Sequence, residues 1–427
     1  METDYSGRKK KSESVPRMQN EWRIIGLTSY GHALCHVCEL AFAALLPAVM
    51  IEFSLEADQA AGLMVPGLIL FGVGALPSGI WTDRRGPTES MSGYFLSVIA
   101  AALLIYFAGS VLVLKIGLAC LGAAISIYHP TGLSMLSKGC ANRGRAMGIN
   151  GVAGSFGVAI GPSLGILMLS YFNWRMTYLA IAVASLIGLI LTRVTPIQID
   201  VEATLSKSKE GKAGQPAKLL VILFVAMLVG GFNYRCITTA LPNYLGDTQT
   251  ISQTVIEGNS EESESEQATP KLGWLAVFSV FALGAIGQLA GGHLADKFKP
   301  ALLYPLTILA TIPFALLIDR VLPGAGILCA GTLAVFMFAE QPLENTMIAD
   351  ATPAKWRSTI YGLKFILAFG IASTGAYFSG WIWRYYGLAR VFDVYAMGAG
   401  LMAIIATCYF LALRRFERQK DRLAAES

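Results

Sequence analysis

Three titratable side chains lie at helical spacing in an otherwise apolar stretch near the start of the chain. His32, His36 and Glu39 are four and three residues apart, so in a helix they share one face. Histidine titrates near neutral pH, and a carboxylate shielded from water can also exchange a proton in that range. Together with Cys35, the same residues offer ligands for a transition metal. The spacing therefore predicts a proton-exchanging site or, as the alternative, a metal site.

Other polar side chains lie in the middle of apolar stretches, where an ionisable group is costly and therefore a candidate for function. Arg235 stays charged, so it could bind an anionic group of a substrate or pair with Glu340 or Glu344. Lys364 is expected to extend toward the membrane surface. The candidates for substrate binding or proton coupling are Glu39, His36, His32, Tyr128, His129, Asn233, Tyr234, Arg235, Glu340, Gln341 and Glu344.

The elements that hold these residues are predicted to be membrane-spanning helices. The chain has 427 residues, of which 54% are hydrophobic and 14% charged, whereas soluble domains are about 25% charged. Apolar stretches long enough to cross a bilayer must be helical, because lipid offers backbone groups no hydrogen-bond partners. The sequence predicts an all-α membrane protein with twelve transmembrane helices at about 24–51, 60–82, 88–109, 111–137, 146–170, 174–193, 218–243, 272–295, 300–318, 325–349, 358–382 and 388–413.

Basic residues near the span ends predict the orientation. Lysine and arginine gather before the first span, in alternate loops and after the last span, which places both termini in the cytoplasm. These loops explain the formal charge of +5 without a nucleic-acid partner. The predicted domains are a tail (1–23), a six-helix bundle (24–193), a linker (194–217), a second six-helix bundle (218–413) with an acidic external loop (243–271), and a tail (414–427).

A repeated signature indicates that the two bundles arose by duplication. Gly79-Ile80-Trp81-Thr82-Asp83-Arg84 returns as Gly292-His293-Leu294-Ala295-Asp296-Lys297, with the aspartates 213 positions apart. His129-Pro130 and Gln341-Pro342 are 212 apart, as are Arg145 and Arg357. A fixed offset of about half the length predicts two pseudo-symmetric units around a central site. Gly79 and Gly292 are expected to allow close helix packing, and the aspartates to lie at helix-starting turns.

The fifth predicted span carries a second glycine pattern. Gly157, Gly161 and Gly165 recur every four residues, which predicts a flat stripe for tight helix packing. Pro162 removes one backbone hydrogen bond and favours a bend.

Taken together, these motifs resemble the major facilitator superfamily over essentially the whole chain. Gly157-Val158-Ala159-Ile160-Gly161-Pro162-Ser163-Leu164-Gly165 is similar to the GxxxGPxxG pattern of its proton-coupled exporters. The first half resembles the fosmidomycin-resistance group of bacterial efflux proteins in His36, Leu45-Leu46-Pro47, Tyr128-His129-Pro130 and Arg143-Gly144-Arg145, but Thr131 replaces the group's acidic residue.

The resemblance implies a bacterial inner membrane and a cavity lined by spans one, four, seven and ten. It also implies a conformational latch formed by Gly79, Asp83, Arg84, Gly292, Asp296, Lys297, Arg145 and Arg357.

The sequence therefore predicts a secondary transporter that exports a small organic compound, which could be anionic, in exchange for protons. One alternative is a carrier of a transition metal or metal chelate, with His32, Cys35, His36 and Glu39 as ligands and His129 completing the site. Another is a non-transporting membrane sensor or assembly factor. An enzyme is not expected, because the chain has no P-loop, serine elbow or HExxH pattern. We expect a monomer that interacts with the bilayer, a small-molecule substrate and protons, without a cofactor.

Overall fold

The structure is a computed structural model, and it describes residues 17–140, 143–195, 197, 215–246, 273–352, 360 and 363–426. Most of the predicted tail 1–23, of the linker 194–217 and of the acidic loop 243–271 lies outside these residues, as does Arg357. Within the described residues the chain forms helices joined by short turns, with no strand.

The first half consists of helices that make six spans. The first span is broken, because a 3-10 segment, η1, separates its two helices where Pro47 begins the second one. The elements are α1 (Arg17–Leu40), η1 (Ala41–Leu45), α2 (Leu46–Phe53), α3 (Ala57–Gly62), α4 (Val65–Val73), α5 (Ala75–Arg85), α6 (Pro87–Tyr106), α7 (Val111–Ile125), α8 (Tyr128–Gly139), α9 (Arg143–Tyr171) and α10 (Arg175–Val194).

The second half repeats this arrangement with longer helices, although the eleventh span is interrupted by a π-helical segment, η4, and a 3-10 segment, η5. Its elements are α11 (Ala217–Gly246), α13 (Gly273–Lys297), α14 (Pro300–Leu317), α15 (Pro323–Ala351), η4 (Ile366–Gly370), η5 (Ile371–Ser373), α17 (Thr374–Tyr386) and α18 (Arg390–Glu426). Prolines lie inside α9, α11, α14 and α15.

The prediction of twelve spans is confirmed. In the described part of the chain, eleven helical runs are long and apolar enough to cross a membrane. The pair Ala57–Val73 and Ala75–Thr82, bent by 41°, makes a twelfth. Some predicted ends were wrong: α1 begins at Arg17, α11 continues to Gly246, and α18 runs to Glu426 through most of the predicted tail. The hydropathy of the tail is too low for a span, but helix formation continues beyond the apolar segment.

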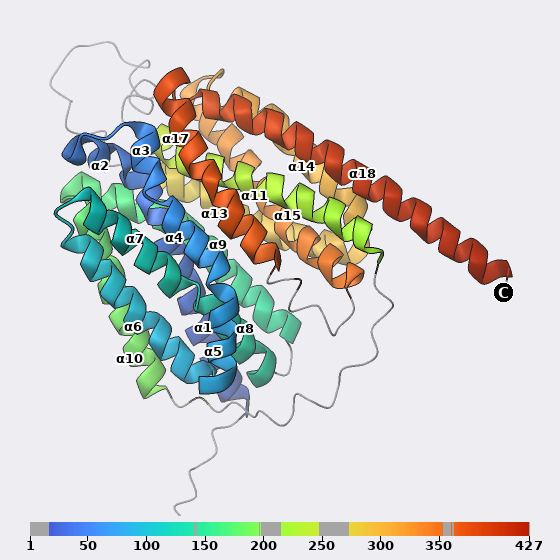
Figure 1. Ribbon diagram of the computed structural model, residues 1–427, viewed down its shortest axis with the longest axis horizontal. Helices are drawn as coiled ribbons and strands as arrows, with labels where there is room; N and C mark the ends of the chain where they lie inside the picture. Colours follow the sequence, from blue (N-terminus) through green and yellow to red (C-terminus); the bar gives the residue numbers. More distant parts are fainter. Residues whose placement is uncertain are drawn as a thin grey trace, which may run out of the picture.

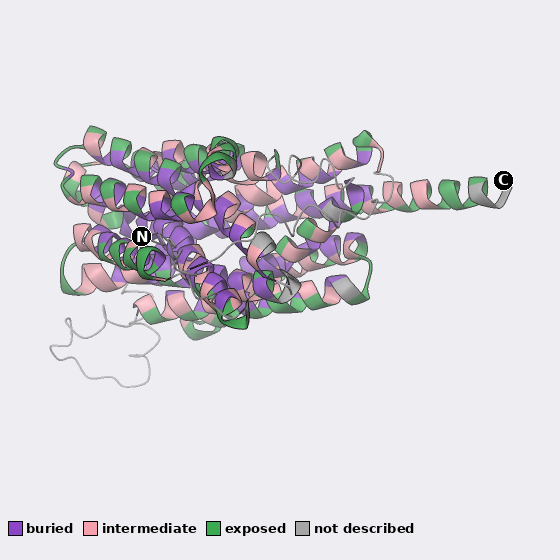
Figure 2. Cartoon of the chain, turned by 90° about the horizontal axis from the view of Figure 1, so that it is seen from below, coloured by how far each residue is buried: buried purple, intermediate pink, exposed green. Residues whose placement is uncertain are grey.

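The helices form two bundles that meet near α2, α3 and α17 and diverge from there (Figure 1). Between the bundles, α9 packs on α13, α3 on α17, and α4 on η4. Exposed residues cover much of the outside of the helices (Figure 2), and many of them are large apolar residues, such as Ile187, Leu306 and Ile404. A surface of this kind suits contact with lipid.

Glycines set how closely α9 approaches α1 and η1. A Cβ added at Gly161 would lie 3.0 Å from the Val37 carbonyl oxygen, and one at Gly165 would lie 3.1 Å from that of Ala41. Gly79 and Gly292 differ, since a Cβ there would meet only Pro130 at 3.6 Å and Pro342 at 4.0 Å. The close packing predicted at these two glycines is therefore absent from this conformation, although both lie against the prolines that the duplication pairs.

Candidate functional site

A cavity of roughly 770 Å³ lies between the two bundles, within the usual range for small-molecule sites. Its wall follows α9, α13 and α15 toward the side of the molecule where α1 begins and α18 ends. On the opposite side the bundles are joined, and Arg384 of α17 donates to Asp58 of α3 at 3.1 Å. Eight of the predicted site residues line the cavity: His32, His36, His129, Asn233, Tyr234, Glu340, Gln341 and Glu344. Glu39, Arg235 and Tyr128 lie behind its wall.

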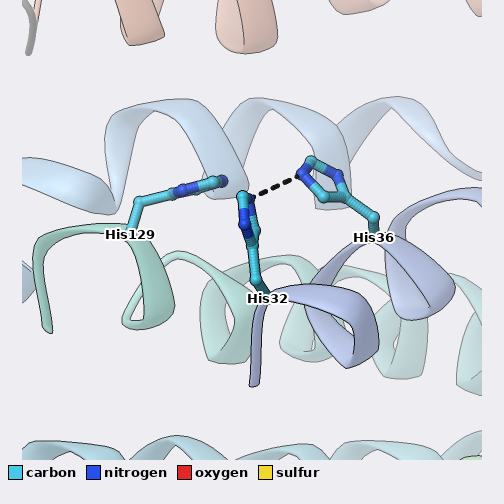
Figure 3. Close-up of side chains that lie close together, drawn as sticks. All are labelled: His32, His36 and His129. Carbon is cyan, nitrogen blue, oxygen red and sulfur yellow. Dashed lines mark hydrogen bonds between the residues drawn. The ribbon is translucent and has the colours of Figure 1, made fainter. Parts of the chain in front are cut away.

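Three imidazoles converge on the first-half side of the cavity, and we call His32, His36 and His129 the histidine cluster. His32 and His36 come from successive turns of α1, and His129 comes from α8 (Figure 3). The Nε2 atoms of His32 and His36 are 3.2 Å apart. One ring nitrogen from each of the three residues lies within 4.8 Å of the others. A single small ion could therefore contact all three rings.

Hydrogen bonds on the far side of two of these rings fix their tautomers. His32 Nδ1 lies 2.7 Å from the Asn150 carbonyl oxygen, which can only accept. His36 Nδ1 lies 2.6 Å from the Glu39 carboxylate, which also accepts when ionised. Each Nδ1 must then carry a hydrogen, so in the neutral rings each Nε2 presents a lone pair. Two lone pairs facing each other at 3.2 Å require a shared positive atom, either a proton or a metal ion.

A polar network behind the cluster holds His32 in place. The amide of Asn150 donates to the Tyr128 hydroxyl at 2.9 Å, and that hydroxyl donates to the Thr28 carbonyl at 2.7 Å. The Tyr128 ring stacks on His32 with ring centroids 5.1 Å apart. Tyr128 is buried and does not line the cavity. In this conformation it therefore contacts the cluster but not the cavity.

His129 completes the cluster and faces the second half. Its ring stacks on Phe365, which precedes η4, with ring centroids 5.3 Å apart. Its Nε2 is buried and has no hydrogen-bond partner within the described residues. An unsatisfied buried nitrogen is costly, so this atom is available for a ligand.

Glu39 connects the cluster to the second half of the molecule. Its Oε2 accepts from His36, and its Oε1 accepts from Arg235 Nη2 of α11. The side chains of Glu39 and Arg235 are 0% and 1% exposed. Of the two roles left open for Arg235, pairing with Glu340 or Glu344 is not found, because its partner is Glu39 of α1. Its Nε and Nη1 have no partner in the described part of the chain.

A second charged group lies on the opposite wall. Lys364 is buried, and it donates to Glu344 and to Asn345, each at 2.8 Å. The prediction that Lys364 extends toward the membrane surface is therefore wrong. Tyr304 of α14 donates to Glu344 at 2.6 Å. Glu340, one turn before Glu344, lines the cavity without an ion pair or hydrogen bond among the described residues.

Two bundles of six spans around one cavity, with Gly79 and Gly292 facing the paired prolines Pro130 and Pro342, are what a duplicated transporter requires. The model of the Major Facilitator Superfamily matches residues 29–373 and again 223–426. The chain belongs to this superfamily. It is accordingly a multi-pass membrane protein of a transporter family.

Known proteins agree with this assignment. The chain is 24% identical to YfnC, an uncharacterized MFS-type transporter of Bacillus subtilis (strain 168), over 80% of its own length and 83% of the relative's. It is 28% identical to a probable L-galactonate transporter of Escherichia coli (strain K12), over 31% of its own length and 30% of the relative's.

Solved structures agree on the fold. A bacterial homolog of the human lysosomal transporter Spinster, in an inward-facing and unoccupied conformation, aligns with a TM-score of 0.70 at 15% identity, over 93% of this chain and 98% of the other. Its inward-facing, occupied form aligns with a TM-score of 0.68 at 16% identity, over 94% and 98%.

The superfamily latch is described only in part. Arg84 and Lys297 are exposed at the ends of α5 and α13. The side chains of Asp83, Asp296 and Arg145, and all of Arg357, lie outside the described residues. The latch therefore stays a prediction.

The predicted metal-ligand set is wrong in two members. The Cys35 thiol is fully buried and donates to the Ile125 carbonyl oxygen at 3.8 Å. Position 35 directly precedes His36 in the helix, so its side chain points about 100° away from that of His36. Glu39 already accepts from His36 and Arg235. Within the described residues, the ligand atoms that come together are those of His32, His36 and His129.

Sequence reasoning missed Asn150 and Tyr304 and misplaced Lys364. Asn150 is a polar residue within the glycine-rich span that packs on α1, and this position is the only signal that could have found it. Nothing in the spacing of Tyr304 indicates its bond to Glu344.

Proposed function

We propose that this chain is a secondary active transporter that moves a small polar solute through the central cavity by alternating access. The support is the cavity itself, which contacts both bundles and carries ionisable groups on both walls. If the basic loops mark the cytoplasm, the cavity opens to the cytoplasm in this conformation. The exporter-like glycine pattern of α9, and the resemblance of the first half to the fosmidomycin-resistance group, favour export.

We propose that protons drive this transport and that Glu340 exchanges the coupled proton. Of the carboxylates predicted for this task, Glu39 is held by Arg235 and His36, and Glu344 by Lys364 and Tyr304. Glu340 faces the cavity without such a partner in the described part of the chain. A carboxyl group in this position can gain and lose a proton without breaking an ion pair. This is the observation that carries the proposal.

The charges around the cavity favour a neutral or cationic solute. The sequence favoured an anionic substrate only if the positive charge of Arg235 faced the cavity. Arg235 is instead bonded to Glu39 and lies outside the cavity lining. Apart from histidine, the acidic and basic residues of the described lining are Glu340, Glu344 and Lys364. With both glutamates ionised, these groups leave one net negative charge.

An untargeted metabolite comparison tests this function. Cells that produce the wild-type chain should differ from cells without it in the inside-to-outside ratio of at least one small polar compound. Glu340→Gln should abolish that difference, because the amide cannot exchange a proton. Glu417→Gln, which removes an exposed carboxylate bonded to Lys299, is the matched control and should leave the difference intact.

Everted membrane vesicles then test coupling. Adding the compound that differs should move protons, detected with a pH-sensitive dye, in wild-type and Glu417→Gln vesicles but not in Glu340→Gln vesicles. Solute transport without proton movement would refute the coupling. A wild-type chain that changes no metabolite would favour the sensor or assembly factor.

A further inference from the structure

The histidine cluster offers three nitrogens to one point in the cavity. His32 and His36 direct their Nε2 atoms toward each other at 3.2 Å, each with a lone pair when its ring is neutral, and the Nε2 of His129 is buried without a partner within the described residues. We propose that the cluster binds a divalent transition-metal cation and that this cation is part of the transported cargo. This inference rests on the proposed function, because it takes the cavity as the transport path.

The distance between the first two ligands already suits a metal. Metal–nitrogen bonds of about 2.0–2.1 Å at a tetrahedral angle place two ligand nitrogens about 3.3 Å apart. The His32 and His36 Nε2 atoms are 3.2 Å apart. The third nitrogen lies within 4.8 Å of the others. A shift of this nitrogen toward α1 by up to about 1.5 Å would bring it into range.

The groups behind the rings are those expected of metal-binding histidines. Such a histidine donates its other ring N–H to a carboxylate or a backbone carbonyl, which orients the ring and makes the free nitrogen a better ligand. His36 has the Glu39 carboxylate in this position, at 2.6 Å, and His32 has the Asn150 carbonyl, at 2.7 Å.

Three neutral imidazoles suit a borderline cation such as Zn²⁺, Co²⁺ or Ni²⁺ more than Mg²⁺ or Ca²⁺, which prefer oxygen ligands. With three protein ligands, the fourth coordination position is open and faces the cavity. The volume of roughly 770 Å³ leaves room there for water or for an organic ligand of the metal. When both glutamates are ionised, the net negative charge of the described lining also favours a cation.

Metal titration of the full chain tests the site. The protein is purified through a tag that contains no histidine, placed in lipid nanodiscs at neutral pH, and titrated with Zn²⁺ against a fluorescent chelator. We expect one Zn²⁺ per chain. His129→Gln and His32→Gln should each weaken binding at least tenfold, because loss of a second-shell partner alone costs about 10- to 100-fold. With Co²⁺, the wild-type chain should give the strong visible absorption of a tetrahedral site.

Two variants serve as controls. His293→Gln removes the fourth histidine of the chain, which is exposed on α13, and Cys35→Ala removes the thiol beside the cluster. Both should bind Zn²⁺ like the wild type. Absence of Zn²⁺ binding by the wild type, or equal loss of binding in His293→Gln, would overturn the site. Each variant must keep the wild-type melting curve, and His129→Gln provides the test if His32→Gln does not fold.

A transport experiment tests whether the cation is cargo. Proteoliposomes containing a Zn²⁺-sensitive dye should accumulate Zn²⁺ under an imposed pH gradient with the wild-type chain but not with His129→Gln. Zn²⁺ binding without Zn²⁺ movement would overturn the cation as cargo. If His129→Gln moves the organic solute and protons like the wild type, the inference fails while the proposed function stands. If Zn²⁺ moves without protons, the proposed coupling fails while the inference stands.

Discussion

The Glu39–Arg235 pair should show an unequal response to removing either partner. Both side chains are almost fully buried, at 0% and 1% exposure, and they join α1 of the first bundle to α11 of the second. Removing one partner of a buried pair costs about 3–5 kcal/mol, because it leaves an uncompensated charge. The two residues differ, however, in the hydrogen-bond partners that each keeps after the other is replaced.

Glu39→Gln should be the more damaging change. Arginine cannot lose its charge in a protein, and Arg235 has Glu39 as its one charged partner, with its Nε and Nη1 lacking partners among the described residues. We expect a loss near the top of that range, about 4–5 kcal/mol. Arg235→Met leaves Glu39 with the His36 donor at 2.6 Å. That variant should lose about 3 kcal/mol or less.

The double variant Glu39→Gln/Arg235→Met removes both charges and should be more stable than Glu39→Gln alone. Equilibrium unfolding in mixed micelles measures all four members of the cycle, with Glu417→Gln as the control for loss of an exposed carboxylate. If Glu39→Gln is no less stable than Glu417→Gln, or if the double variant loses the sum of both single changes, the reasoning is refuted.

Two glycine substitutions test the packing around the cavity. Gly154→Ala places a Cβ 2.5 Å from His32 Cε1, so the ring must shift by about 1 Å to regain van der Waals contact. Zn²⁺ affinity measured by titration should fall about tenfold, whereas Gly148→Ala, with nothing within 4 Å of its Cβ, should match the wild type. Gly380→Ala places a Cβ 2.5 Å from the Ala57 carbonyl oxygen, where α3 packs on α17. It should favour a state open on that side, seen by mass spectrometry as slower maleimide modification of a cysteine placed in the cavity by Gln341→Cys. An unchanged rate would contradict this prediction.

The fold could be predicted almost completely from the sequence because the bilayer imposes strict conditions on backbone hydrogen bonding. An apolar stretch of sufficient length must be a helix, so hydropathy alone locates the spans. The errors lie at the ends, as in α18, where a polar continuation beyond the membrane can be helical or irregular. Hydropathy also fails to indicate breaks, such as η1 and the 41° bend after Val73.

For the candidate site, the sequence could predict which helices carry the polar residues but not how those residues pair. The polar residues of spans one, four, seven and ten were found because ionisable groups are rare in such spans. Their pairings were not found, because helical spacing gives the face of a residue but not its neighbour on another helix. Glu39 and Arg235 are 196 residues apart, and nothing in the spacing of either one indicates the other. Lys364 was misplaced for the same reason, since its partner Glu344 lies on a different helix.

Glu39 gives the two halves of the site a physical connection. Its Oε2 orients the His36 ring of the histidine cluster, while its Oε1 holds Arg235 of the second bundle. A divalent cation bound at the cluster would place a second positive charge near the same carboxylate and would repel the Arg235 guanidinium in a poorly screened interior. Cation binding should therefore weaken the contact that joins α1 to α11, without any direct contact between the cation and the second bundle. The Glu39–Arg235 mutant cycle, repeated with saturating Zn²⁺, measures this effect as a smaller coupling free energy. An unchanged coupling would mean that the cluster and the ion pair act independently.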